Sequence, residues 1–504
     1  MEKYFLSIDN GGTNTKIIIF DHHGNELGSQ AFPTKDLTPK PGFHELDLVQ
    51  LRQDVLLNIK QALKKTGLTG EQISAVVTVG HGKGLYVLDQ AGEIMMNGIL
   101  SADSRAKDLA VEFEKKVATV YDHAKQHIMA SQAPVLLAWL KKHDPKKYAQ
   151  IGSVLANKDL MGYFLTGEIK QEIGDASGNH FLDLATGHYD SKLFEFFGIE
   201  EMYLMMPPLI KATDVRGKIT PEVAKKTGLV TGTPVFGGLF DIDACALATG
   251  VLAEDKFSVI AGTWNINTFP SEKTAPLASG LMNSLFPTDK WLVEASSPTS
   301  AGNLALMIKL LLEKEVAQAK DRGKTIYDDL EVFLANSDAT FTKLIYFPFL
   351  YGSNVSTDAK ASFLGLDNKT TRSEMIRAVY EGIVFAHYQH LTELLNVAKT
   401  APSVVRISGG ATNSKAWIQM FADVFGLPVE TVAASELGGL GGALTCAVGL
   451  GLYPDFKTAC SHMVTVKERF EPNQKQHALY AKKYQIYQAL LTALEPVWSK
   501  FDER

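Results

Sequence analysis

The first twenty residues hold the feature that most constrains the fold of this chain. An apolar run from Phe5 ends on Asp9, two adjacent glycines follow, and a second β-branched run ends at Phe20. This pattern predicts two antiparallel strands joined by a tight turn. Adjacent glycines let the backbone N–H groups of the turn approach an anion, and Asp9 is placed to hold the cation that accompanies a polyphosphate. An ordinary hairpin with a Gly-Gly turn would look the same, so the rest of the chain has to decide.

Length, charge and cysteine content exclude several classes. A chain of 504 residues is too long for one hydrophobic core, so we expect two large domains. No apolar run reaches the roughly 18 residues of a membrane span, and no export segment is evident. The net charge of −6 argues against broad binding to nucleic acid or anionic membranes. The three cysteines, Cys245, Cys446 and Cys460, are too few for a disulfide framework, which predicts a cytoplasmic protein.

A segment near the middle of the chain repeats the N-terminal pattern. Residues 257–261 form an apolar run that meets Gly262-Thr263 and then returns to strand-like sequence. The two segments lie about half the chain apart, which suggests duplication of one α/β unit. Amphipathic helices are predicted at 48–64 and 134–142, and their alternation with strands such as 73–80 favours an α/β fold. We expect the two halves to meet across a cleft.

Three further glycine-rich segments lie at predicted strand or helix ends. Residues 233–241 form a predicted strand that ends in two glycines and Asp241, ahead of a helix of small residues. A carboxylate there can cap the helix, or it can accept a proton from a substrate hydroxyl at the carboxyl edge of a sheet. Asp243 fits a first-turn acid that favours the helix dipole. Residues 404–410 repeat the strand-glycine pattern, and residues 436–443 open a helix on four glycines, so a phosphate-binding protein is favoured.

Over almost its whole length the chain resembles the FGGY carbohydrate kinases of the actin-like ATPase superfamily. Residues 9–13 are similar to the family's first phosphate loop, Gly262-Thr263 to its second, and residues 409–411 to its adenosine-binding loop. Asp241 falls on the position of the family's catalytic base. Further segments that agree are 41–47, 101–105, 165–168 and 175–178. The resemblance implies two actin-like, ribonuclease H-like α/β domains, with the sugar bound by residues 1–250 and the nucleotide by residues 251–504.

The resemblance also implies the chemistry, which is ATP-dependent phosphorylation of a terminal sugar hydroxyl with Mg²⁺ as cofactor. Asp241 would take the hydroxyl proton, and Asp9 and Asp241 would serve the metal. The implied ATP-binding residues are Gly11, Gly12, Thr13, Asn14, Lys16, Gly262, Thr263, Gly302, Gly409, Gly410, Ala411 and Asn413. The implied substrate-binding residues are His81, Gly82, Lys83, Asp103, Arg105 and Asp241.

The loop around Lys83 bears on which sugar is phosphorylated. Many D-xylulose kinases carry Gln-Met-His-Gly after the second strand, whereas this chain has His81-Gly82-Lys83-Gly84. Residues 81–89, 237–241, 294–303 and 347–354 look most like the L-xylulose kinase branch, so L-xylulose or a related ketopentose is the expected acceptor. Because a lysine suits a carboxylate, gluconate is the alternative, with D-xylulose behind it. A solvated lysine on a glycine loop would carry no such information.

Functions of other classes stay open on the sequence alone. Filament and chaperone ATPases of the same superfamily hydrolyse ATP without a sugar, and a sugar-sensing regulator would bind a sugar without phosphorylating it. No helix-turn-helix segment or basic arm supports the regulator. The expected partner is a small sugar or sugar acid, without nucleic acid or membrane, and a homodimer is left open.

Three aromatic or imidazole side chains invite a functional interpretation. His387 and His390, three residues apart on a predicted helix at 374–395, are expected to pack or lie on the helix surface instead of binding metal. Trp264 could contact the nucleotide, with core packing at least as well supported.

Overall fold

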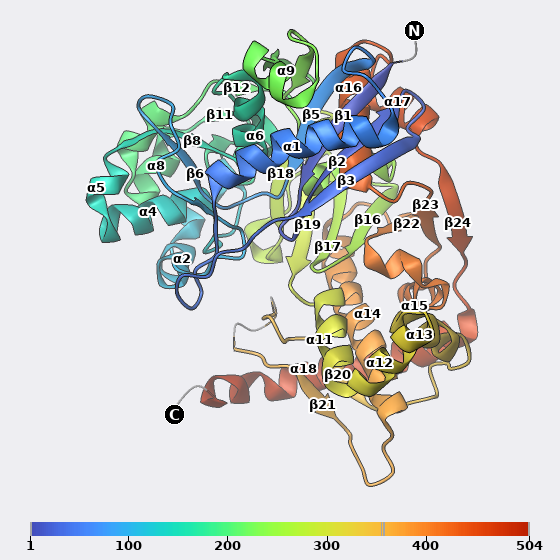
Figure 1. The fold of residues 1–504 in the computed structure, drawn as a ribbon. Coiled ribbons are helices and arrows are strands. Elements are labelled where there is room, and N and C mark those ends of the chain that lie inside the picture. The colour runs from blue at the N-terminus through green and yellow to red at the C-terminus, as the bar shows by residue number, and fades with distance from the viewer. Residues whose placement is uncertain (1–2, 354, 356–357, 502–504) are drawn as a thin grey trace. The chain divides into compact units, whose positions relative to one another are not determined.

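Two mixed β-sheets organise the chain in the computed structural model, which describes residues 3–353, 355 and 358–501 (Figure 1). The chain divides into two units that interleave along the sequence. Unit 1 consists of Met1–Leu252, Pro270–Val293 and Ala434–Thr465. Unit 2 consists of Ala253–Phe269, Glu294–Ala433 and Val466–Arg504.

The sheet of unit 1 has the strand order β13-β14-β5-β1-β2-β3, with β15 also paired to β5. The β1–β2 hairpin is antiparallel and places Asp9 opposite Lys16, whereas β5 runs parallel to β1. The strands are β1 (Tyr4–Asn10), β2 (Asn14–Asp21), β3 (Glu26–Pro33), β5 (Ile73–Gly80), β13 (Val215–Lys218), β14 (Pro234–Phe236) and β15 (Leu239–Phe240). The strand-turn-strand prediction for the N-terminus is therefore confirmed.

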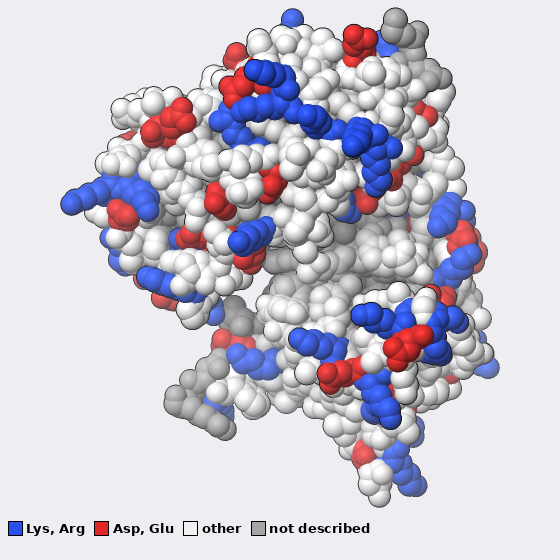
Figure 2. All heavy atoms as spheres, in the orientation of Figure 1, with Lys and Arg blue, Asp and Glu red and all other residues white. Residues whose placement is uncertain are grey.

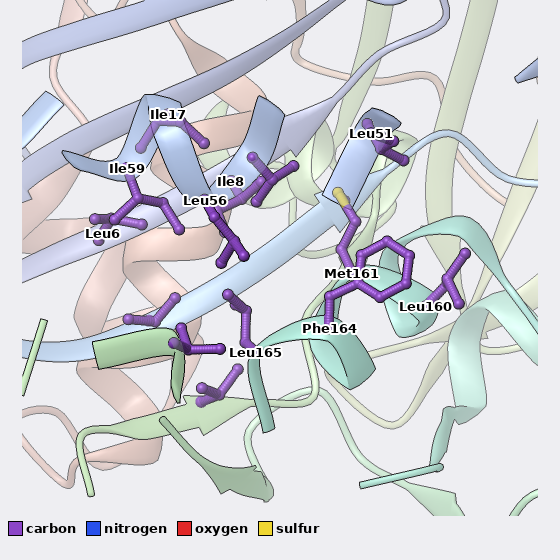
Figure 3. Close-up of a cluster of buried hydrophobic side chains, with 14 of the residues drawn as sticks. Leu6, Ile8, Ile17, Leu51, Leu56, Ile59, Leu160, Met161, Phe164 and Leu165 are labelled. Atoms are coloured by element: carbon purple, nitrogen blue, oxygen red, sulfur yellow. The ribbon is translucent and has the colours of Figure 1, made fainter. Parts of the chain in front are cut away.

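Helix α1 (Leu48–Thr66) packs against the β2–β3 side of this sheet. It begins after Asp47, whose carboxylate accepts the N–H groups of Val49 and Gln50, and it ends at Gly67, which has a φ of 71°. Successive strand residues face opposite ways, so Leu6 and Ile8 share the face that meets α1 and α6 (Asn157–Thr166). Figure 3 shows the resulting core, where the labelled side chains of these strands and helices point toward one another.

The opposite face of β1 contacts α16 (Leu437–Gly449), and glycines permit that contact. A Cβ added to Gly438 would lie 2.2 Å from Asp9 Oδ2, and one on Gly442 would lie 2.4 Å from Ser7 Oγ. A Cβ on Gly441 would lie 2.5 Å from the carbonyl oxygen of Ala244. The glycines that the sequence grouped with phosphate-binding segments therefore serve close packing between a helix and the sheet.

Unit 2 repeats the same strand arrangement. Strands β16 (Lys256–Ala261) and β17 (Asn265–Ser271) form an antiparallel hairpin, and β16 runs parallel to β22 (Val404–Ser408). Strand β23 (Val429–Val432) pairs parallel with β22, and β24 (Val466–Phe470) pairs antiparallel with β23. A hairpin with a parallel third strand thus occurs in both units, as the duplication predicts.

Several helices complete the units. In unit 2, α14 (Arg372–Val397) starts with a capping box between Thr371 and Glu374. His387 and His390 on α14 are buried and hydrogen-bond to Ser300 (3.0 Å) and Ser297 (2.8 Å), so their packing role is confirmed. Other helices are α2 (Lys107–Glu114), α4 (Ala133–His143), α7 (Ile173–Ser177), α8 (Ser191–Phe197), α9 (Pro221–Thr227), α10 (Asp241–Ala248), α11 (Ala301–Leu311), α15 (Lys415–Phe425), α17 (Phe456–Met463) and α18 (Gln474–Trp498).

The distribution of charged side chains on the surface and the polarity of the helices both bear on the expectations from composition. Figure 2 shows acidic and basic side chains interspersed over the face that it draws. Among the helices of the described ranges, none is both long enough and apolar enough to cross a membrane.

Candidate functional site

Three strands of unit 1 end together at one edge of the sheet. Asn10 of β1 and Phe240 of β15 both stand opposite Gly80, the last residue of β5. The His81 N–H donates to the Asn10 carbonyl (3.1 Å), which ties two of these ends together. Ligands of open α/β sheets bind at this carboxyl edge. The residues that leave the sheet there are Gly11, His81 and Asp241.

The turn of the β1–β2 hairpin is held at its base and open at its tip. The Gly11 N–H donates to the Asn14 carbonyl (3.0 Å), and the Thr13 carbonyl accepts the Thr34 N–H (2.9 Å). Gly12, Thr13 and Asn14 are exposed. Backbone donors in a fixed and open turn can bind a phosphate group.

Asp9 lies beside an ion pair whose second member the sequence analysis missed. Lys16 Nζ is 2.6 Å from Glu436 Oε2, although 420 residues separate them in the chain. Burial raises the pKa of Asp9 to about 6, with Lys16 opposing the rise and Glu436 adding to it. Burial raises the pKa of the Cys245 thiol, and the carboxylates of Asp241 and Asp9 add to the rise, with Asp241 having the larger effect. Both carboxylates are therefore near Cys245. Crowded carboxylate oxygens suit Mg²⁺, so the donor set fits that ion.

Asp241 is the first residue of α10, and Phe240 holds the N-cap position. The interpretation of Asp241 as the helix cap is therefore wrong. Asp243 is a first-turn acid, as expected, but it is also buried. A Cβ on Gly174 would lie 3.1 Å from Asp243 Oδ2, so the start of α10 packs against α7.

Asp175 on α7 is a second buried acid near Asp241. Its Oδ1 accepts a hydrogen bond from Asn179 Nδ2 (3.2 Å), and its buried Oδ2 has no hydrogen-bond partner among the described residues. Burial raises the pKa of Asp175 to about 8, Lys158 opposes the rise, and acids that include Asp241 add to it. At neutral pH Asp175 is therefore protonated. The sequence had singled it out only as part of a segment that resembles the family.

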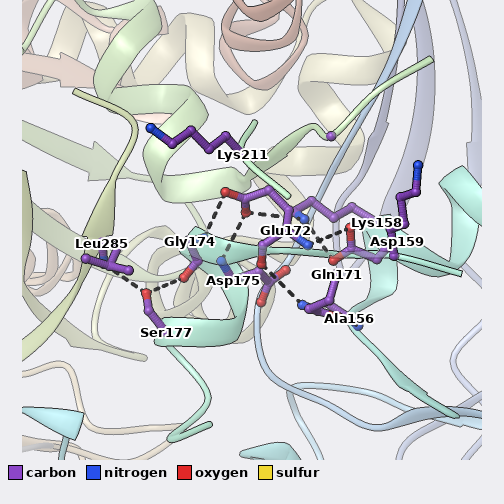
Figure 4. Close-up of polar contacts among 12 residues, drawn as sticks. Ala156, Lys158, Asp159, Gln171, Glu172, Gly174, Asp175, Ser177, Lys211 and Leu285 are labelled. Carbon is purple, nitrogen blue, oxygen red and sulfur yellow. Dashed lines mark hydrogen bonds and ion pairs between the residues drawn. The ribbon is translucent and has the colours of Figure 1, made fainter. Parts of the chain in front are cut away.

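Four charged side chains beneath α7 form what we call the buried ion cluster: Lys158, Asp159, Glu172 and Arg216. Lys158 Nζ is 2.9 Å from Asp159 Oδ2 and 3.4 Å from Glu172 Oε2, and the Arg216 guanidinium pairs with Asp159. All four are buried. Figure 4 shows the part of this network around Lys158, Asp159 and Glu172.

The buried ion cluster anchors two segments that lead to the acids. The Glu172 carboxylate accepts the N–H groups of Gly174 (2.8 Å) and Asp175 (3.1 Å), which caps α7. Arg216 Nη2 donates to the Gly237 carbonyl (3.2 Å), just ahead of β15 and Asp241. Both Asp175 and Asp241 are thus positioned from the same cluster.

The contribution of Asp175 to the free energy of unfolding is expected to fall as the pH rises from about 4, the pKa of an unfolded Asp, to about 8, the folded pKa of Asp175. In that window the folded protein keeps a proton that the unfolded chain has lost, so raising the pH favours unfolding. Asp175→Asn, which resembles the protonated acid, should flatten this slope. Urea unfolding between pH 5 and pH 8, without nucleotide or Mg²⁺, measures it; equal slopes in both proteins would contradict the assignment.

The loop after β5 packs against the residue that precedes Asp241. Burial lowers the pKa of His81 to about 4, so this imidazole is neutral at pH 7, and it hydrogen-bonds to the Tyr86 hydroxyl (3.1 Å). A Cβ on Gly82 would lie 2.3 Å from the Phe240 ring. Lys83 Nζ lies 5.6 Å from the centroid of that ring.

Asp103 and Arg105 form a compact pair. Arg105 Nε donates to both carboxylate oxygens of Asp103 (3.0 Å each), and Arg105 Nη2 donates to Glu45 Oε1 (2.8 Å). The guanidinium lies 4.1 Å from the centroid of the Phe43 ring. These contacts fix the pair within the fold, and its contact with substrate stays a prediction.

The expected nucleotide-binding glycines of unit 2 come together at the ends of its parallel strands. Ile260 of β16 stands opposite Ser408 of β22, so Gly262 and Gly409 follow at one edge. Gly409 has a φ of 88°, and a Cβ there would lie 2.7 Å from the Ala261 carbonyl carbon. Only glycine fits this conformation and this close approach.

Gly302 joins the same group from α11. The Ala301 N–H donates to the Gly262 carbonyl (2.9 Å), and a Cβ on Gly302 would lie 3.4 Å from the Thr263 carbonyl oxygen. Gly410 and Asn413 are exposed on the short 3₁₀ helix Gly410–Asn413, whereas Ala411 is buried. Trp264 is 36% exposed, so the core-packing alternative for this ring is wrong.

Comparison with known families accounts for most of the chain. The N-terminal domain of the FGGY family of carbohydrate kinases matches residues 4–248, and the C-terminal domain of that family matches residues 257–450. The Escherichia coli L-xylulose/3-keto-L-gulonate kinase is 34% identical over 510 residues, which cover 100% of this chain and 99% of that protein. A probable L-xylulose kinase of Pasteurella multocida is 32% identical and covers 98% of this chain and 99% of its own length.

Solved structures agree on the fold. A ligand-bound xylulose kinase from Lactobacillus acidophilus superposes with a TM-score of 0.90 at 22% identity, covering 99% of this chain and 100% of that one. The gluconate kinase of the same organism gives a TM-score of 0.88 at 23% identity, with 99% and 100% coverage. The predicted pair of actin-like α/β domains is thereby confirmed.

Proposed function

Because the chain belongs to the FGGY family of carbohydrate kinases, we propose that it transfers the γ-phosphoryl group of ATP to a terminal hydroxyl of L-xylulose or a closely related sugar. The likeness to relatives named for L-xylulose supports this acceptor. The observation that carries the proposal is the placement of Asp241, the Gly11–Thr13 turn and the Lys83 loop at one carboxyl edge of unit 1.

Asp241 is the general base of this proposal. Its carboxylate would accept the proton of the sugar hydroxyl as the hydroxyl oxygen attacks phosphorus, a role worth about 10²- to 10⁴-fold in rate. Asp175, when protonated, leaves Asp241 without a second ionised carboxylate on the α7 side. Lys158 and Arg216 hold α7 and the Gly237 carbonyl, so both acids keep their positions during turnover.

In this proposal, the turns at Gly11–Thr13 and at Gly262-Thr263 both bind phosphate groups. In the proposed N-terminal sugar-binding domain (residues 1–250), the residues that would contact phosphate are Gly11, Gly12, Thr13, Asn14 and Lys16. In the proposed C-terminal nucleotide-binding domain (residues 251–504), the residues that would hold the nucleotide are Gly262, Thr263, Gly302, Gly409, Gly410, Ala411 and Asn413. Open backbone donors in fixed turns support these roles. Asp9 and Asp241 would hold Mg²⁺, which neutralises phosphate charge when bound. His81, Lys83, Asp103 and Arg105 stay proposed for the sugar.

Gly409→Ala is expected to weaken ADP binding by about tenfold or more, because the added Cβ displaces the Ala261–Gly262 backbone in the turn. Isothermal titration with ADP measures this loss. Gly323→Ala is the matched control, since Gly323 also has a positive φ (69°) but has open space around it. Equal affinities for Gly409→Ala and wild type would contradict the nucleotide role of this turn.

A coupled ADP-release assay over L-xylulose, 3-keto-L-gulonate, D-xylulose and gluconate tests the acceptor. The proposal predicts the highest kcat/KM for L-xylulose or 3-keto-L-gulonate. A higher value for gluconate or D-xylulose would reject the acceptor and keep the family. ADP release that no sugar increases would favour an ATPase, and tight sugar binding without ADP release would favour a regulator.

A further inference from the structure

Lys83 occupies a backbone conformation that favours glycine. Its φ is 65°, in the left-handed region, and it stands between Gly82 and Gly84. Long side chains are uncommon there because the Cβ approaches the following carbonyl group. Stability alone would therefore select glycine at residue 83, so the lysine side chain calls for a functional explanation.

The Lys83 ammonium has no anionic partner in the described part of the chain. The side chain is partly buried, and its Nζ lies 5.6 Å from the centroid of the Phe240 ring. An aromatic ring is a weaker partner for a cation than a carboxylate is. Asp241 directly follows Phe240, so the ring that Lys83 contacts belongs to the residue next to the proposed base.

The other cations near the site are already engaged. Lys16 is paired with Glu436, and Lys158 is fully buried between Asp159 and Glu172. An acceptor that carries a negative charge would be repelled by Asp9 and Asp241 unless a cation compensates it. Arg105 is likewise paired with Asp103 and Glu45, so among the cations described above Lys83 is left to supply this charge.

We propose that Lys83 binds the carboxylate of an acidic sugar, which lets the enzyme accept sugar acids beside neutral ketoses. The inference rests on the proposed function, in which Asp241 receives the proton of the acceptor hydroxyl. A keto acid pairs its carboxylate with Lys83 while its far hydroxyl faces Asp241. A neutral ketopentose offers Lys83 a hydroxyl group but no charge, so it gains less from this residue.

Steady-state kinetics of Lys83→Met with two acceptors tests the inference. For freshly prepared 3-keto-L-gulonate, kcat/KM should fall by about 10- to 100-fold, the usual effect of losing a charged hydrogen bond. For neutral L-xylulose, which reaches Lys83 through a hydroxyl group, the fall should be only about 2- to 5-fold, the effect of losing a neutral hydrogen bond. Lys83→Arg should keep most of the activity on the acid. For the wild-type enzyme, the KM for the acid should rise with salt concentration, whereas the KM for L-xylulose should not.

Two further variants separate this role from a structural one. Lys141→Met removes a lysine that also lies 5.6 Å from an aromatic ring, that of Tyr148, and it should change neither acceptor's kinetics. Lys83→Gly should keep or raise the melting temperature, because glycine suits the φ of 65°, while losing most of the activity on the acid.

The outcomes distinguish this inference from the proposed function. No phosphorylation of either acceptor by wild type would contradict the proposed function. Wild-type activity that is confined to L-xylulose, or an equal loss for both acceptors in Lys83→Met, would overturn the inference alone. A selective loss for the acid supports it.

Discussion

Asp241→Asn is expected to lower kcat for sugar phosphorylation by about 10²- to 10⁴-fold while ADP affinity stays within about threefold of wild type. Asparagine keeps the size of the side chain but cannot accept the hydroxyl proton. Asp241 lies at the start of α10, after a strand that ends level with β5, so the substitution removes the base at the proposed acceptor position. Initial rates and isothermal titration with ADP measure the two quantities.

Glu222→Gln is the matched control for this substitution. Glu222 is also an acid in the first turn of a helix, α9, but it is exposed and forms an ion pair with Lys226. The control should turn over at the wild-type rate. Near-normal turnover of Asp241→Asn would reject Asp241 as the base, and a parallel loss of ADP binding would indicate a general disturbance of the site.

Arg216→Met is expected to lower the free energy of unfolding by about 3–5 kcal/mol, the usual cost of leaving a buried charge without its partner. Arg216 is fully buried, pairs with Asp159, and donates to the carbonyls of Lys170 (2.6 Å) and Gly237 (3.2 Å). Methionine can fill part of the volume but satisfies none of these acceptors. Urea unfolding at pH 7 measures the change.

Two variants make this prediction specific. Lys226→Met removes a cation from the exposed Glu222–Lys226 pair and should leave the free energy of unfolding almost unchanged. Arg216→Lys keeps the charge but loses the planar donor fork, so it should fall between wild type and Arg216→Met. A loss below about 1 kcal/mol in Arg216→Met, the level of an exposed pair, would contradict the role of the buried ion cluster.

Local patterns in the sequence predicted much of the fold. The predicted strand at 73–80 has the same bounds as β5, and β22 forms the strand part of the predicted strand-glycine segment at 404–410. The predicted helix at 134–142 differs from α4 by one residue at each end. These elements follow from apolar periodicity and from glycine or proline at their ends, which are properties of neighbouring residues.

Contacts between distant parts of the chain were not predictable in the same way. Lys16 and Glu436 pair because α16 packs on β1, and no local pattern links the two residues. The glycines of α16 resembled a phosphate loop, since close helix packing and close ligand approach both require a missing side chain.

Buried charge was the other signal that the sequence concealed. Lys158 and Asp159 look like ordinary polar residues of an amphipathic helix, yet both are fully buried in the structure. Their burial depends on Glu172 and Arg216, which come from separate segments. Asp175 gains its raised pKa from the same tertiary surroundings, so neither feature can be read from one sequence.

The most direct test of the account is ³¹P NMR of a reaction with Mg-ATP and L-xylulose. The account predicts one sugar phosphomonoester for each ADP formed. Without the sugar, ADP should form much more slowly and no phosphomonoester should appear. ADP together with free inorganic phosphate, formed at the same rate with and without L-xylulose, would contradict it.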